Sequence, residues 1–194
     1  MGDPIAPTGP DLGRGVTLGG VPSGGILEGQ VAGEAVLLVR RGKDLYAVAA
    51  ACGHWGFPLA GGIVVGCEIR CPWHHARFDC RTGGAAGPPS PRDIATWEIF
   101  REGDRVRVGA KRTQAAARAS APGPSSVVMV GAGGAADAAA ATLRREGYAG
   151  PITLIGRDAE SIPIDRPNLS KDFLSGAAPE EWLPVRTKEF YAEQ

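Results

Sequence analysis

The sequence lacks an excess of charge of either sign, and it lacks any long run of apolar residues. Its 194 residues include 21 lysines and arginines and 21 aspartates and glutamates, so the formal net charge is zero. Balanced charge implies no general attraction to nucleic acid or to an anionic membrane. No apolar run reaches the roughly 20 residues of a membrane span, and no basic and apolar leader pattern opens the chain. We therefore expect a soluble, cytoplasmic protein that binds neither nucleic acid nor membrane.

Histidine and cysteine are also scarce, with 3 and 4 residues, and most of them lie in one short stretch. Cys52 and His54 form a C-x-H pattern, and Cys71 and His74 form a C-x-x-H pattern. Rieske-type [2Fe–2S] clusters have such a ligand set, in which two histidines replace two thiolates on one iron. The pattern predicts that Cys52 and Cys71 hold one iron and that His54 and His74 hold the other.

These ligand types favour one-electron transfer over hydrolysis. Two ferric irons, two sulfides and two thiolates sum to zero charge, so reduction leaves only about −1 on the cluster. A four-thiolate cluster starts about two charges more negative, which makes an added electron less favourable. Each neutral imidazole keeps a second N–H that can release a proton. We therefore expect electron transfer that can be coupled to a proton, with no separate catalytic residue.

Two cysteines and two histidines can also form a closed, tetrahedral zinc site. Zinc modules usually separate the first pair of ligands by about two to four residues, whereas one residue separates Cys52 from His54. The spacing favours the iron–sulfur cluster and leaves a non-redox zinc-binding interaction module as an alternative.

The second loop resembles the second cluster loop of Rieske-type ferredoxins. The resemblance rests on Cys71–Asp79 followed by Arg81-Thr82-Gly83, and Gly56–Leu59 after the first loop also fits. It implies that His75 follows a ligand without being one.

The other two cysteines, Cys67 and Cys80, have no place in this ligand set. Respiratory-type Rieske proteins join their cluster loops by a disulfide, but Phe57 and Trp73 stand at the corresponding positions here and cannot form one. Cys67 and Cys80 could approach each other. For a cytoplasmic chain we interpret them as buried free thiols without a role.

Short strand patterns separated by glycine and proline predict an all-β domain over residues 16–110, an antiparallel sandwich or barrel with two cluster loops. Residues 1–15 are rich in glycine and proline and predict a flexible arm. Strand pairs are predicted at 35–40 with 45–49, at 63–65 with 68–70 and at 96–101 with 105–108, with a further strand at 76–79 and a loop over 83–91.

A second unit is predicted after a small, basic and proline-bearing linker at residues 111–125. Residues 127–130 indicate a buried-type strand, an alanine-rich helix runs to about residue 146, and residues 152–155 indicate a second strand. This βαβ pattern begins with a G-x-G-x-x-A turn, which places a pyrophosphate at a helix N-terminus. The predicted cofactor-binding residues are Gly131, Gly133, Gly134 and Ala136 in the turn, and Asp158 at the position that binds a ribose hydroxyl.

Residues 162–171 are similar to the D-R-P-x-L-S-K segment of FAD-dependent ferredoxin reductases. This similarity implies that Arg166 and Lys171 lie near the flavin and its phosphates. From about Val16 to its end, the chain resembles apoptosis-inducing-factor-like ferredoxin reductases with an N-terminal Rieske domain. Residues 126–194 would then be a fragment of the Rossmann FAD domain, because one βαβ unit can neither bury both faces of its sheet nor enclose FAD.

The expected function is an electron carrier within an NAD(P)H- and FAD-dependent oxidoreductase. Electrons would pass from reduced nicotinamide to a flavin domain, then singly through the cluster to a redox partner protein. The alternative is a stand-alone ferredoxin of an oxygenase or nitrite reductase system. A catalytic oxygenase subunit is excluded, because its iron needs two histidines and a carboxylate and only His75 remains.

Overall fold

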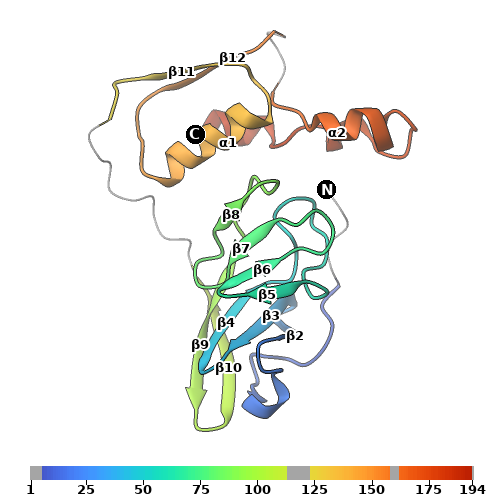
Figure 1. Ribbon diagram of the computed structural model, residues 1–194, viewed down its shortest axis with the longest axis vertical. Helices are drawn as coiled ribbons and strands as arrows, with labels where there is room; N and C mark the ends of the chain where they lie inside the picture. Colours follow the sequence, from blue (N-terminus) through green and yellow to red (C-terminus); the bar gives the residue numbers. More distant parts are fainter. Residues whose placement is uncertain (1–5, 113–122, 158–161, 194) are drawn as a thin grey trace. The chain divides into compact units, whose positions relative to one another are not determined.

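The computed structural model describes residues 6–112, 123–157 and 162–193. The chain divides into two compact units, Met1–Gln114 and Ala115–Gln194, which are called unit 1 and unit 2 below (Figure 1). None of the helices in these described ranges is long and apolar enough to cross a membrane.

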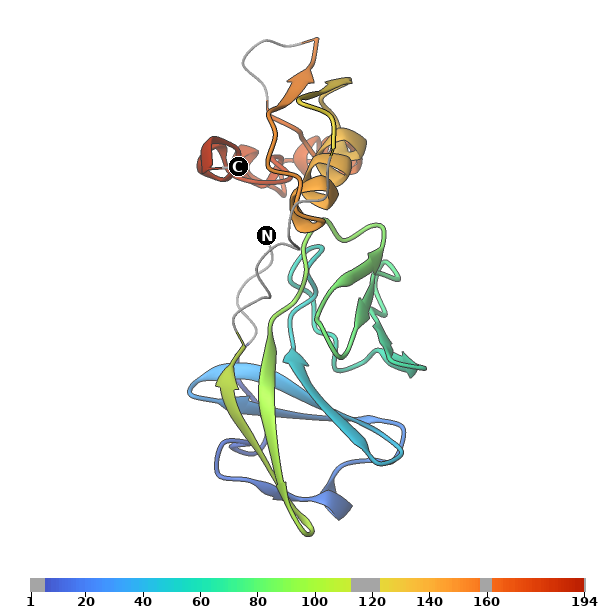
Figure 2. The ribbon, with the colours of Figure 1, turned by 90° about the vertical axis from the view of Figure 1, so that its left-hand side faces the viewer.

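Unit 1 consists of two antiparallel sheets (Figure 2), in agreement with the predicted all-β domain. The larger sheet has the strand order β1-β10-β9-β4-β3-β2, and the smaller has the order β5-β6-β7-β8. The elements are β1 (Val16–Thr17), a 3-10 helix η1 (Leu18–Gly20), β2 (Ile26–Val31), β3 (Glu34–Arg41), β4 (Asp44–Ala49), β5 (Ile63–Val65), β6 (Glu68–Arg70), β7 (Arg77–Asp79), β8 (Ala85–Gly87), β9 (Thr96–Glu102) and β10 (Arg105–Lys111).

Strand β3 is the centre of unit 1, because both of its faces are buried. Val36 and Leu38 belong to one core cluster, Leu37 and Val39 belong to another, and all four are 0% exposed. Successive side chains of a strand point to opposite faces, so an uninterrupted apolar run suits a strand that is covered on both sides. The core cluster of Leu37 and Val39 also contains the two cysteines of the predicted metal site.

The predicted hairpins are confirmed, with small differences at their ends. Arg41 pairs with Asp44 at the turn between β3 and β4, and β5 and β6 coincide with the predicted strands. The predicted loop over residues 83–91 is wrong at residues 85–87, because Ala85–Gly87 form β8 and pair with β7. Small residues without apolar alternation carry no strand signal there, and pairing with a neighbouring strand decides the structure.

The predicted flexible arm at residues 1–15 is wrong from Pro10 onward, because the Gln30 N–H donates to the Pro10 carbonyl at 3.0 Å. Leu12 is 0% exposed and packs in the core cluster on the other side of β3 from the cysteines. Its N–H donates to the Gln30 carbonyl at 2.8 Å, and the Val108 N–H donates to the Leu12 carbonyl at 2.9 Å. One buried leucine and these backbone hydrogen bonds therefore hold a segment whose composition indicates a free terminus.

The predicted linker at residues 111–125 is described only at its two ends, because residues 113–122 lie outside the described ranges. Lys111 is the last residue of β10, and the Arg112 N–H donates to the Thr96 carbonyl at 2.7 Å. The hydrogen bonding of the larger sheet thus extends into the first residues that we assigned to the linker.

Unit 2 contains the predicted βαβ arrangement. Strands β11 (Val127–Val130) and β12 (Ile152–Ile155) pair in parallel, and α1 (Gly134–Arg145) lies between them in the chain. The segment after β12 forms α2 (Arg166–Asn168), a short π-helix η2 (Leu169–Phe173), a 3-10 helix η3 (Glu180–Trp182) and α3 (Lys188–Glu193).

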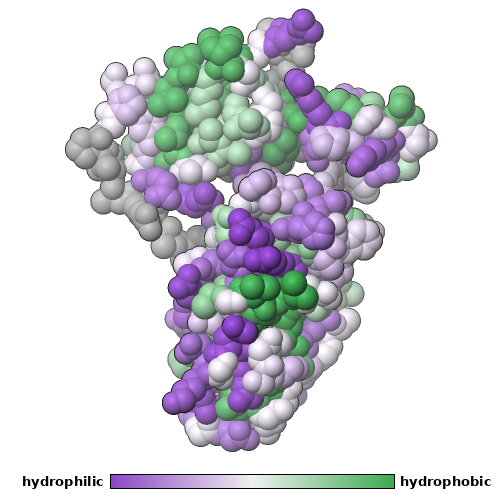
Figure 3. Space-filling model, in the orientation of Figure 1, coloured by the Kyte–Doolittle hydropathy of each residue, from purple (hydrophilic) through white to green (hydrophobic). Residues whose placement is uncertain are grey.

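One face of this two-stranded sheet is open. Val128, Val130 and Ile155 are 59%, 90% and 50% exposed, and Figure 3 shows hydrophobic surface in this part of unit 2. The prediction that residues 127–130 form a buried-type strand is therefore wrong for alternate residues, because nothing in the described chain covers that face. A cavity of about 500 Å³ also remains between α1, β12 and α3. Unit 2 leaves apolar surface that a complete α/β layer would bury.

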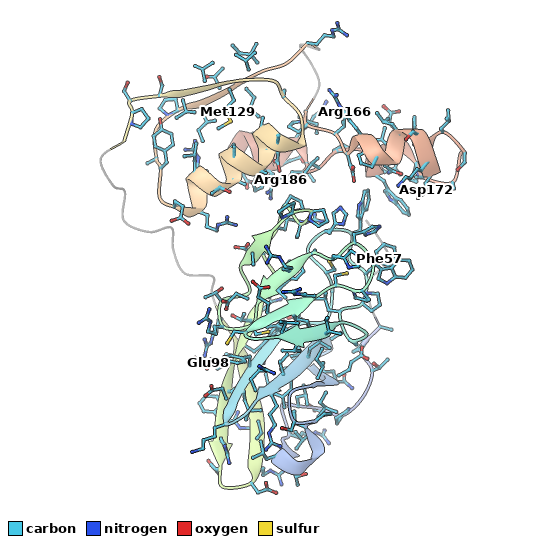
Figure 4. The ribbon with its side chains drawn as sticks, viewed as in Figure 1. Phe57, Glu98, Met129, Arg166, Asp172 and Arg186 are labelled. Carbon is cyan, nitrogen blue, oxygen red and sulfur yellow. The ribbon has the colours of Figure 1, made fainter. Side chains whose placement is uncertain are left out.

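A buried ion pair holds α3 against α1. Asp137 is 1% exposed, and its Oδ1 accepts hydrogen bonds from Arg186 Nε at 2.9 Å and from the Tyr191 hydroxyl at 2.8 Å. Arg186, labelled in Figure 4, also lies over the Phe190 ring at 4.5 Å. A buried carboxylate requires such partners, so these contacts fix the end of the described chain on the helix.

The packing of Leu12 predicts a measurable cost for its truncation. We expect Leu12→Ala to lower the free energy of unfolding by about 2–5 kcal/mol, because it leaves a cavity in a closed core. Urea unfolding of the intact chain, followed by tryptophan fluorescence, measures the change. The control is Ile63→Ala at a side chain that is 62% exposed, with an expected change within about 0.5 kcal/mol. Equal effects of the two substitutions would show that Leu12 does not pack as described.

Candidate metal centre

The loops with the predicted metal ligands lie at one end of unit 1. The first loop, Cys52–Phe57, follows β4, and the second, Cys71–Ala76, joins β6 to β7. The N–H of each cysteine donates to the carbonyl at the end of its own loop, at 2.8 Å in both cases. The same backbone hydrogen bond therefore closes both loops.

A second hydrogen bond returns to each cysteine from the residue four positions later. The N–H of Gly56 donates to the Cys52 carbonyl at 2.8 Å, and the N–H of His75 donates to the Cys71 carbonyl at 3.2 Å. Both donors have left-handed backbones, with φ of 78° at Gly56 and 61° at His75. A non-glycine residue pays a conformational cost there, so His75 stands where the backbone geometry favours glycine. Its side chain is exposed.

The structure brings the four predicted ligands together as two pairs. Cys52 and Cys71 are 4% and 2% exposed, and both belong to the same core cluster. The rings of His54 and His74 have centroids 5.0 Å apart and an interplanar angle of 86°. His54 is partly buried and His74 is exposed. The sulfur side of the site is therefore enclosed by the core, and the imidazole side reaches solvent.

The surroundings of the site shift the pKa values of Cys52 and His54 in the directions that burial dictates. Burial raises the pKa of the Cys52 thiol to about 11, and the neighbouring Cys71 adds to the rise. Burial lowers the pKa of His54 to about 4, and His74 and Arg92 lower it further. A buried thiolate needs a bound cation to replace its proton, and a neutral imidazole is the form that binds metal.

The donor set fits a binuclear cluster better than a single ion. The Nδ1 atom of His54 is buried and has no hydrogen-bond partner, which is costly unless a ligand satisfies it. Within the described ranges, no group of three or more His, Cys, Asp or Glu side chains could hold one metal ion. A tetrahedral zinc site needs such a group, whereas a [2Fe–2S] cluster takes two protein ligands on each of two irons.

An aromatic stack links the two loops. The rings of Phe57 and Trp73 are nearly parallel, with centroids 4.2 Å apart and an interplanar angle of 16°. Figure 4 labels Phe57, which lies at this end of unit 1 among other ring side chains. These are the positions at which the sequence excludes an inter-loop disulfide, and stacking contributes about 0.5–1.5 kcal/mol beyond area burial.

Arg92 is a site residue that the sequence analysis missed. Its Nε donates to the Gly53 carbonyl at 2.9 Å, and its NH2 donates to the His54 carbonyl at 3.0 Å. A Cβ atom at Gly53 would lie 2.4 Å from the Arg92 carbonyl oxygen, so the first loop needs glycine there. A single arginine in a proline-rich loop carries no spacing signal, and its role follows from a contact across 38 residues.

The predicted cofactor-binding glycines of unit 2 lie together between β11 and α1. Gly131 has φ of 113°, which favours glycine, and a Cβ at Gly131, Gly133 or Gly134 would meet no atom within 4 Å. The space beside this turn is therefore open, as a bound phosphate group requires. Ala136 is 9% exposed and packs inward from the first turn of α1.

The remaining predicted cofactor contacts lie on other segments. Arg166 is the first residue of α2, Lys171 lies in η2, and both side chains are exposed. Asp158 lies outside the described residues.

The Arg92 contacts predict a stability effect that an exposed arginine does not share. Arg92→Leu removes a charged donor from two carbonyls, so we expect the free energy of unfolding to fall by about 1.5–3 kcal/mol. The matched control is Arg101→Leu, because Arg101 Nε donates to the Gly103 carbonyl at 3.0 Å on the exposed surface. The control should change stability by no more than about 0.5 kcal/mol. Urea unfolding compares the two variants, and a larger loss at Arg101 would contradict the described role of Arg92.

The chain is similar in sequence to proteins of known family. Residues 18–98 match the family described as the Rieske [2Fe-2S] domain. The chain is 34% identical over 169 residues to apoptosis-inducing factor 3 of Homo sapiens, a match covering 80% of this chain and 27% of that protein. The chain therefore spans about a quarter of the length of that relative.

Shorter relatives are matched over most of their own length. The ferredoxin component of the naphthalene 1,2-dioxygenase system of Pseudomonas aeruginosa is 34% identical over 93 residues, covering 48% of this chain and 89% of that protein. Among solved structures, the ferredoxin of carbazole 1,9a-dioxygenase from Nocardioides aromaticivorans IC177 aligns at 28% identity and a TM-score of 0.47, covering 55% of this chain and 97% of that one. The chain belongs to the Rieske [2Fe–2S] family, with a ferredoxin-like electron-transfer domain.

Proposed function

We propose that Cys52 and Cys71 hold one iron of the [2Fe–2S] cluster and that His54 and His74 hold the other. The observation that carries this proposal is the convergence of two buried thiols and two imidazoles from loops that the same backbone hydrogen bonds close. When bound, the cluster supplies one-electron transfer.

The protein side chains give the two ends of the site different roles. The buried cysteines exclude water from the sulfur side, where Leu59 and Ile69 of the same core cluster are 0% exposed. The exposed His74 brings the imidazole side to the surface, where a partner protein can approach. The ring nitrogen of His74 that does not bind metal can hold or release a proton there.

A pair of histidine variants tests the ligand assignment. His74→Ala removes one ligand, and we expect iron and acid-labile sulfide to fall at least about tenfold, because a closed ligand set does not tolerate the loss of a member. His75→Gly should keep full iron and sulfide. It should also raise the free energy of unfolding by up to about 1 kcal/mol, because glycine adopts the left-handed backbone without strain.

Iron and sulfide contents of the purified variants, with wild type as the reference, give the answer. Loss of iron in His75→Gly together with retention in His74→Ala would reverse the assignment of the two neighbouring histidines.

We further propose that unit 2 is the first part of the FAD-binding region of an NAD(P)H-dependent reductase. In such a protein the cluster would accept electrons from the flavin and pass them on one at a time. The 169-residue match to apoptosis-inducing factor 3 is longer than unit 1 and so must extend into unit 2, which supports a composite protein. The parallel βαβ unit and the open glycine turn are consistent with a dinucleotide site. Arg166 and Lys171 remain proposed flavin contacts, and the electron acceptor is a redox partner protein.

A stand-alone ferredoxin is the second candidate function. The match to the naphthalene 1,2-dioxygenase ferredoxin component favours it, because this match covers 89% of that protein. In that case unit 2 would have no nucleotide to bind, so nucleotide binding separates the two candidates.

Binding of ADP tests the role of the glycine turn, because a first βαβ unit contacts the ADP half of FAD. We expect wild type to bind ADP and Gly133→Asp to bind at least about tenfold more weakly, a loss of about 1.4 kcal/mol, because the new carboxylate repels the phosphates. The control, Gly176→Asp, places the same charge at another open glycine of unit 2, outside the glycine turn. Isothermal titration calorimetry measures all three affinities. No ADP binding by wild type would favour the stand-alone ferredoxin.

A further inference from the structure

Cys67 and Cys80 bracket the hairpin that carries the second cluster loop. Cys67 directly precedes β6, Cys80 directly follows β7, and the loop Cys71–Ala76 joins these two strands. From the sequence alone, both cysteines are interpreted as buried free thiols without a role. Their position at the base of this hairpin gives them one.

The strand register places the two cysteines opposite each other. Glu68 pairs with Asp79, so Cys67 and Cys80 are the next pair outward, and the Cys80 N–H donates to the Cys67 carbonyl at 2.7 Å. Both cysteines lie in turns just beyond the paired strands. Cys80 belongs to the same core cluster as Ile69, and Cys67 is close enough to Cys80 to interact with it electrostatically.

This placement is compatible with a disulfide bond. Directly opposite residues in a hydrogen-bonded antiparallel pair have Cα atoms about 5.5 Å apart. Disulfides span Cα separations of about 4.4–6.8 Å, so the strands need no separation or sliding for the bond to form.

The two thiols differ in access and in polarity of their surroundings. Cys67 is partly buried, its Sγ lies 3.9 Å from the Tyr46 hydroxyl, and the Arg81 guanidinium is close enough to interact with it electrostatically. Cys80 is 1% exposed, and burial raises the pKa of its thiol to about 11, with Asp79 and Cys67 adding to the rise. Partial access favours reaction at Cys67, while Cys80 is shielded from reagents.

We propose that Cys67 and Cys80 form a reversible disulfide that clasps the base of the second cluster-loop hairpin, with a low-molecular-weight disulfide such as oxidised glutathione as the oxidant. Cys67 loses its thiol proton to solvent, attacks one glutathione sulfur and releases glutathione thiolate, which takes up a proton. Cys80 then attacks Cys67 in the mixed disulfide, loses its proton and releases the second glutathione. Two protein thiols lose one electron pair in total, and one glutathione disulfide becomes two glutathiones.

The clasp acts on the cluster loop without touching its ligands. The bond closes a ring around β6, the loop and β7, and thereby limits the opening of Cys71 and His74 away from the first loop. Slower release of iron is the expected consequence, and this part of the inference rests on the proposed ligand assignment.

Peptide mapping tests the bond itself. The purified holoprotein is incubated anaerobically with oxidised glutathione, alkylated without reduction and digested with trypsin and chymotrypsin. These enzymes leave Cys67 in residues 60–70 and Cys80 in residues 79–81, separate from Cys52 and Cys71. Wild type should yield the cross-linked pair. Cys67→Ser should yield no cross-link, and Cys80→Ala should stop at a glutathione adduct on Cys67.

Two results of the map would overturn the disulfide. One is a wild-type chain in which both cysteines remain alkylated, and the other is a stable glutathione adduct on Cys67 in the presence of Cys80. A purified chain without iron would instead contradict the proposed function, and the map would still test the disulfide.

The rate of iron release to a chelator tests the clasp. We expect oxidised wild type to release iron about threefold or more slowly than reduced wild type, because the closed ring restricts loop opening. Cys67→Ser is the control, with the same rate before and after glutathione treatment. Equal rates for cross-linked and reduced wild type would show that the bond does not act on the cluster loop.

Discussion

The candidate metal centre depends on the backbone hydrogen bonds that close its two loops. Each loop ties the N–H of its cysteine to a carbonyl at the loop end, and it ties the carbonyl of that cysteine to an N–H four residues on. These bonds fix the backbone from which each thiol and imidazole projects. Strand β3 connects the two core clusters of unit 1. Leu37 and Val39 pack in the cluster that contains Cys52 and Cys71, and Val36 and Leu38 pack in the other cluster.

The two ends of the site differ in burial. The cysteines lie inside the core, where an uncompensated thiolate is unfavourable, while His74 lies at the surface. On the proposed ligand assignment, metal binding on the inner side is coupled to folding, and exchange of electrons or protons belongs to the outer side. Phe57 and Trp73 connect the loops by stacking at the place where a covalent bridge is absent. Stacked rings hold the loops less rigidly than a disulfide would. The positions of the loops therefore depend on the surrounding hydrogen bonds, including those of Arg92.

Local patterns predicted much of this structure, and long-range contacts account for the rest. The C-x-H and C-x-x-H spacings, the β3–β4 turn and the βαβ order depend on neighbouring residues, which a sequence displays directly. Leu12 and Arg92 were missed because each is decided by a partner distant in sequence. β8 was missed because its small residues carry no strand signal. The exposed side of β11 was missed for a related reason. Its apolar composition describes what the strand can bury, but the described chain provides a cover for one face only.

The low-temperature EPR spectrum of the purified chain, before and after reduction by dithionite, tests the central claim most directly. Iron and sulfide are quantified in the same sample. We predict a Rieske-type signal that is present only after reduction, with two irons and two sulfides for each chain. A chain with stoichiometric zinc and no reducible chromophore would contradict electron transfer and would leave a structural metal site in unit 1.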